Sequence, residues 1–93
     1  MMNEQQVFDR VRDIIVDVKS ATSPVDRAQL TRETALEQPP LSMDSLDFVQ
    51  FVVGVEESFG IIAQDSDFLG LNTIADSVAL ILGWDSDGSP RFA

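Results

Sequence analysis

The stretch Leu41-Ser42-Met43-Asp44-Ser45-Leu46-Asp47 decides how this chain of 93 residues is interpreted. It follows a proline pair, which favours an extended backbone, and it opens the longest apolar run of the sequence. Asp44 is a good helix N-cap, and Asp47 three positions later completes a capping box with the shorter acid. Ser45 is therefore predicted at a helix start, with its hydroxyl outward beside the unpaired N–H groups.

Residues 45–59 are predicted to form the central helix. A strand is the competing interpretation, but the run lacks period-2 alternation and is long for a strand. The polar residues of the run fall on one narrow stripe, which predicts one exposed edge: Asp47, Gln50, Gly54, Glu57 and Ser58. Gly54 within a helix costs ~1 kcal/mol relative to alanine, so we expect it to permit close approach of another backbone. Gly60 is the expected C-cap.

Two further helices flank the central one. An apolar stripe at helical spacing predicts a core-packing helix over residues 4–19, capped by Asn3. Thr73 is predicted to cap the last helix, with Asp76 three positions on. Gly83 fits a left-handed cap that would let Trp84 fold back onto Val78 or Ala79.

The connections complete the predicted fold. Residues 20–43 form a long loop, with a short turn of helix within 25–30 and with Leu30, Leu36 and Leu41 pinning it to the core. A short helical turn is expected near residues 65–69. The sum is an all-α protein, a small four-helix bundle of three main helices and one short helix. We expect a domain over residues 1–84 and a flexible tail over 85–93.

Composition excludes several function classes. The chain has no cysteine, so it offers neither disulfides nor thiolate metal ligands. It has no histidine, which removes the usual general base, triad partner and zinc ligand. No stretch resembles a signal peptide or a membrane span, so a soluble cytoplasmic protein without membrane insertion is the expectation.

The net charge of −10 is unevenly distributed. Residues 1–32 hold five acids and five bases, whereas residues 33–90 hold eleven acids and neither lysine nor arginine. Such a segment repels nucleic acid and attracts basic protein surfaces, although it also serves solubility alone.

Three roles for Ser45 are weighed. A nucleophilic serine needs a nearby base, and Asp44 and Asp47 are too acidic for that work, so no catalytic residue is predicted. A calcium loop over residues 65–76 fails because Leu69 occupies a ligand position, so no metal site is predicted and these acids are expected to be caps. A modified serine needs no catalytic partner, because a transferase supplies base and metal, and the helix start favours a phosphoester.

The sequence resembles acyl carrier proteins. The match runs through Asp44-Ser45-Leu46-Asp47, Val49, Phe51-Val52-Val53 and Val55-Glu56-Glu57-Ser58-Phe59, against a family pattern D-S-L-D-x-V-E-x-V-M-x-L-E-E-x-F. It continues through Thr73-Ile74-Ala75-Asp76-Ser77-Val78 and covers roughly residues 4–83.

The resemblance implies a carrier that is not an enzyme. Ser45, flanked by Asp44 and Leu46, would hold a covalent 4′-phosphopantetheine arm derived from coenzyme A. Partner enzymes would dock on Asp47, Gln50, Val53, Gly54 and Glu57. The acyl chain would lie among side chains that are equally ordinary core residues: Phe51, Val52, Val55, Phe59, Phe68 and Leu71. The implied partners are a phosphopantetheinyl transferase and acyl-transferring or acyl-modifying enzymes with basic surfaces, acting on a monomer.

Differences from the family pattern indicate which kind of carrier protein to expect. Gln50, Val53 and Ser58 replace the usual glutamate, methionine and glutamate, so the docking helix carries fewer charges. This favours a specialised carrier in fatty-acid, lipid or polyketide-type synthesis. Two alternatives stay open: a peptidyl or aminoacyl carrier domain, and an acidic helical interaction module without a prosthetic group.

Overall fold

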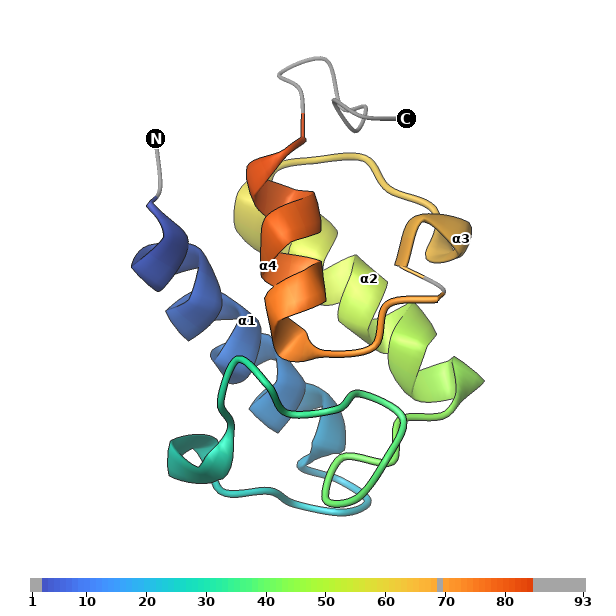
Figure 1. Ribbon diagram of the computed structural model, residues 1–93. Coiled ribbons are helices and arrows are strands. Elements are labelled where there is room, and N and C mark those ends of the chain that lie inside the picture. The colour runs from blue at the N-terminus through green and yellow to red at the C-terminus, as the bar shows by residue number, and fades with distance from the viewer. Residues whose placement is uncertain (1–2, 69, 85–93) are drawn as a thin grey trace.

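The computed structural model describes residues 3–68 and 70–84, and this part of the chain is a helical bundle (Figure 1). The helices are α1 (Glu4–Lys19), α2 (Ser45–Phe59), the short α3 (Asp65–Phe68) and α4 (Ile74–Leu82), with a 3-10 turn η1 (Arg27–Gln29) in the first loop. The predicted all-α class and the order of three main helices and one short helix are confirmed. The tail predicted over residues 85–93 lies outside the described residues.

Each main helix begins with a capping box, as its sequence indicates. The pairs are Asn3 with Gln6 in α1, Asp44 with Asp47 in α2, and Thr73 with Asp76 in α4. In each, two otherwise unpaired N–H groups are satisfied reciprocally. α2 ends at Gly60 in the left-handed conformation with φ of 65°, also as predicted.

The three main helices enclose one apolar core. α1 packs against both α2 and α4, and α3 packs against α2. Gly54 marks the close approach of α1, but the approaching group is a side chain and not the backbone that we expected: a Cβ at Gly54 would lie 2.7 Å from Ile14 Cγ2. The core residues are Val7, Phe8, Val11, Ile14, Ile15, Leu30, Leu36, Leu41, Met43, Phe48, Phe51, Val52, Val55, Phe68, Ile74, Val78, Leu80, Ile81 and Trp84.

The long loop after α1 ties the starts of α4 and α2 together. The Ile74 N–H donates to Thr34 O at 3.0 Å, which satisfies a donor at the start of α4. The Leu36 N–H donates to Asn72 O, and Leu36 O accepts from the Met43 N–H, both at 2.9 Å. Leu30, Leu36 and Leu41 are buried, as predicted. The backbone immediately before Asp44 is therefore held against the core.

The end of α4 differs from the prediction. Gly83 has φ of −86° and is not left-handed. The chain instead continues in a tight right-handed turn, because the Trp84 N–H donates to Ile81 O at 3.1 Å. The indole ring stacks on Phe68, with centroids 6.3 Å apart. Among the described residues, none of the helices is long and apolar enough to cross a membrane.

Candidate modification site at the start of α2

Ser45 is the first residue of α2 and its side chain is exposed. The residues on either side of it are joined by hydrogen bonds: Asp44 Oδ1 accepts from the Asp47 N–H at 2.8 Å. In return, Asp47 Oδ2 accepts from the Asp44 N–H at 3.3 Å. These two bonds fix the backbone on either side of Ser45, so the serine projects from a defined helix start.

Asp47 itself is not on the exposed edge, and that part of the prediction is wrong. It is buried, and its Oδ2 lies 2.9 Å from the Nζ of Lys19 in the last turn of α1. This ion pair joins the end of α1 to the start of α2, and both of its side chains are largely shielded from solvent. Asp47 therefore offers a partner protein little accessible surface.

The outer face of α2 is more apolar than the sequence pattern suggested. Leu46, Val49 and Val53 are 64%, 40% and 46% exposed. Gln50 and Glu57 are also exposed. Because Asp47 is covered, the exposed surface after Ser45 combines three apolar side chains with few charges.

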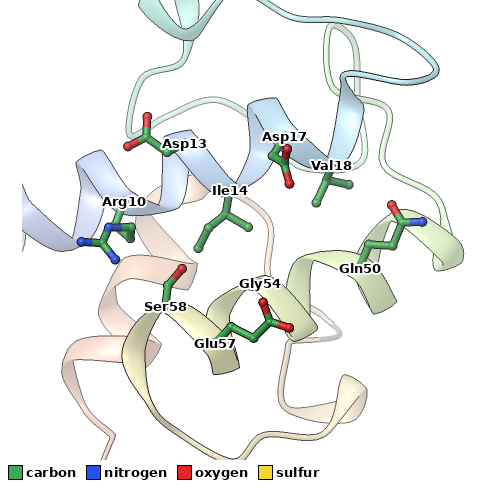
Figure 2. Close-up of a pocket in the computed structure, with 9 residues that line it drawn as sticks. All are labelled: Arg10, Asp13, Ile14, Asp17, Val18, Gln50, Gly54, Glu57 and Ser58. Atoms are coloured by element: carbon green, nitrogen blue, oxygen red, sulfur yellow. The ribbon is translucent and has the colours of Figure 1, made fainter.

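A groove between α1 and α2 brings together three of the predicted docking residues, Gln50, Gly54 and Glu57 (Figure 2). Its volume is about 260 Å³. The opposite wall comes from α1, and the remaining lining residues are Arg10, Asp13, Ile14, Asp17, Val18 and Ser58. From the sequence we expect α1 only to pack against the core. Its acidic residues lie off the apolar stripe, however, and they are the signal that α1 also contributes to this surface groove.

The residues predicted to surround an acyl chain lie in the apolar core or against it. Phe51 and Phe68 meet edge to face, with ring centroids 5.7 Å apart. Phe51, Val52, Val55 and Phe68 are buried, whereas Phe59 and Leu71 are half-buried. Phe51, Val52, Val55 and Phe68 are thus confirmed as core residues, whereas Phe59 and Leu71 only pack against the core. An acyl pocket among the six stays a prediction. None of the six lines the groove beside Gly54.

The basic side chains of α1 and the following loop are largely used within the protein. Arg27 Nε bonds Asp13 at 2.6 Å, and Arg32 bonds Glu4 at 2.6 Å. The hydrogen bond from Arg32 lowers the pKa of Glu4 below its usual value. Lys19 pairs with Asp47, but the Arg27 and Arg32 pairs neutralise acids of α1, so most of the acidic excess of residues 33–90 is left uncompensated.

Two of the acids considered for a calcium loop, Asp67 and Asp76, act as caps. Asp67 accepts from the Gln64 N–H at 2.9 Å. Asp76 Oδ2 accepts from the Asn72 and Thr73 N–H groups at 2.9 and 3.0 Å, and these bonds lower the pKa of Asp76. Within residues 3–68 and 70–84, no three carboxylates gather in a way that could hold a metal ion.

A phosphoester on Ser45 fits this helix start. The hydrogen bonds of the described residues include none from the N–H groups of Ser45 and Leu46, so both can face an added anion. The Asp44 carboxylate opposes the added charge, but it is turned to the Asp47 N–H. The exposed hydroxyl leaves room for an extended substituent.

Comparison with known proteins places most of the bundle in one family. The family model described as "phosphopantetheine attachment site" matches residues 9–81. The acyl carrier protein of Thermotoga maritima is 35% identical over 81 residues, which cover 87% of this chain and 94% of that protein. The acyl carrier proteins of Lactobacillus johnsonii and Lactobacillus acidophilus are 32% and 30% identical over 80 residues, 86% of this chain and 94% of each relative. The chain therefore belongs to the acyl carrier proteins, which carry a covalent 4′-phosphopantetheine and are not enzymes.

Proposed function

We propose that Ser45 is the attachment point of the 4′-phosphopantetheine arm and that the protein carries acyl groups as thioesters on that arm. The observation that carries the proposal is the exposure of Ser45 at the first position of α2, a helix start that is fixed by the Asp44–Asp47 capping box. A phosphopantetheinyl transferase joins this oxygen to the β-phosphorus of coenzyme A, and adenosine 3′,5′-bisphosphate leaves. The transferase supplies base and metal, so the absence of histidine from the chain is no obstacle.

The test is to incubate the apo-protein with coenzyme A and a broad-specificity transferase, and then to measure the intact mass. The wild-type protein should gain one arm, and Ser45→Ala should gain none. Ser42→Ala is the matched control, because Ser42 is an exposed serine three residues earlier. A wild-type protein without mass gain, or a Ser45→Ala protein that still gains the arm, contradicts the proposal.

The surface beside Ser45 supports docking of enzymes that are basic at their edges and apolar at their centre. Leu46, Val49 and Val53 supply exposed apolar area, and Glu57 supplies a charge at the groove. We propose that this face, together with Gln50 and Gly54, receives the acyl-transferring enzymes, while the carrier acts as a monomer. Few charges on the face favour a specialised pathway of fatty-acid, lipid or polyketide-type synthesis over a generic one.

Charge reversal tests this docking. Glu57→Lys should slow acyl transfer to a cognate enzyme at low salt, because one attractive charge becomes repulsive. Glu37→Lys is the control, since Glu37 is an exposed acid in the loop outside this face. Equal slowing by both variants would mean that only the net charge of the protein matters.

A further inference from the structure

Lys19 is a buried cation in the last turn of α1. Only 5% of the residue is exposed, and its ammonium group lies 2.9 Å from Asp47 Oδ2, 28 residues further along the chain. A basic residue at a helix C-terminus is favourable, but burial of an ammonium group is costly unless it is well paired. The position of Lys19 thus depends on Asp47, and the reverse also holds.

Asp47 joins this ion pair to the start of α2. The same Oδ2 atom that binds Lys19 also accepts from the Asp44 N–H, and Asp44 accepts in turn from the Asp47 N–H. Ser45 and Leu46 lie between these two residues. A line of contacts therefore runs from α1 through Lys19 and Asp47 to the backbone that presents Ser45.

The other helix starts show that a capping box alone does not require a cation. Asp76 fills the same position in α4, and it accepts from the Asn72 and Thr73 N–H groups. The ion pairs formed by the described residues do not include Asp76. In α1 the corresponding residue is the uncharged Gln6. Of the three capping boxes, the one that flanks Ser45 is joined to a second helix by an ion pair, Lys19–Asp47.

We propose that Lys19 is a positioning residue for the modification of Ser45, a proposal that rests on the function assigned to Ser45 above. Lys19 holds the Asp47 carboxylate inward, so that the first turn of α2 keeps its cap and presents the serine hydroxyl in one place. It also neutralises an acid that would otherwise face the transferase. Without Lys19 the carboxylate turns to water and releases the Asp44 N–H.

The variant that tests this is Lys19→Met, which keeps the length of the side chain and removes its charge. We expect kcat/KM for arm transfer to fall about tenfold, the factor for one charge-assisted hydrogen bond, with most of the change in KM. The double variant Lys19→Met/Asp47→Asn should recover most of the rate, because the carbonyl oxygen of the introduced asparagine accepts from the Asp44 N–H without needing a cation. Val78→Ala in the α4 core controls for loss of stability alone.

Amide hydrogen exchange gives a readout that needs no transferase. In Lys19→Met the Asp44 and Asp47 amides should exchange faster, while the Thr73 and Asp76 amides of the other box stay unchanged. A wild-type protein that is never modified refutes the function of Ser45, and the exchange result still decides whether Lys19 holds the cap. Unchanged transfer and exchange in Lys19→Met, or an equal loss of transfer in Val78→Ala, overturns the proposal.

Discussion

The starts of α2 and α4 share one local design and differ in what surrounds it. Each has an N-cap and an aspartate three positions later that return each other's hydrogen bonds. The first helical residue is the exposed Ser45 in α2, but in α4 it is Ile74, which is fully buried. The capping motif therefore makes a helix start, and tertiary packing decides whether that start is a site or part of the core.

The largest difference in stability is expected when the first helical residue of each helix, Ser45 or Ile74, is replaced by alanine. Ser45→Ala should abolish arm attachment and change stability by no more than about 0.5 kcal/mol, because it removes an exposed hydroxyl. Ile74→Ala should cost about 2–5 kcal/mol of unfolding free energy through the cavity that it leaves. Urea denaturation of both variants checks this. Similar stability losses would refute the contrast between an exposed and a core start.

The next largest difference is expected between the stability losses caused by replacing the aspartate of each capping box. Asp47→Ala leaves Lys19 buried without its partner and should cost about 3 kcal/mol. Asp76→Ala removes only the cap interactions, at a cost of about 1 kcal/mol. The comparison of urea midpoints is the measurement, and equal losses would mean that the Lys19–Asp47 pair adds nothing to the cap.

The pH dependence of the α4 box gives a smaller effect. Backbone N–H groups lower the pKa of Asp76 below the ordinary value of about 4, so its contribution to stability is complete above that value. The contribution is lost as the pH falls through the lowered pKa of the folded state. Asp76→Asn should therefore lose less stability than the wild-type protein between pH 6 and pH 3. An NMR titration of the Asp76 carboxyl carbon should give a pKa below that of an exposed aspartate, and an ordinary value would contradict this account.

The smallest effect concerns the closeness of α1 and α2. Gly54→Ala gains about 1 kcal/mol in helix propensity but places a methyl group against Ile14, where overpacking costs about 1–3 kcal/mol. We expect a net loss of stability in the wild-type background. In an Ile14→Ala background the same change should stabilise the protein by about 1 kcal/mol. Thermal unfolding measures the effect of Gly54→Ala in each background. If Gly54→Ala destabilises the protein in both backgrounds, Ile14 does not limit this position.

The sequence predicts the features that depend on neighbouring residues. The three caps, the helix ends and the place of Ser45 follow from patterns a few residues long. The Lys19–Asp47 pair escapes prediction because it joins residues far apart in the chain. Its signal is weak: Lys19 follows Ile15 by four positions and so extends the buried stripe of α1. The left-handed cap predicted at Gly83 is wrong because the stacking of Trp84 on Phe68 is a tertiary contact, which local patterns do not contain.

The measurement that tests the central claim most directly is the mapping of the arm by tandem mass spectrometry after transferase treatment and proteolysis. We predict the added mass on Ser45 and on no other hydroxyl, Thr73 at the second box included. An arm on any other residue, or an unmodified Ser45 in the presence of fully active transferase, would contradict this assignment.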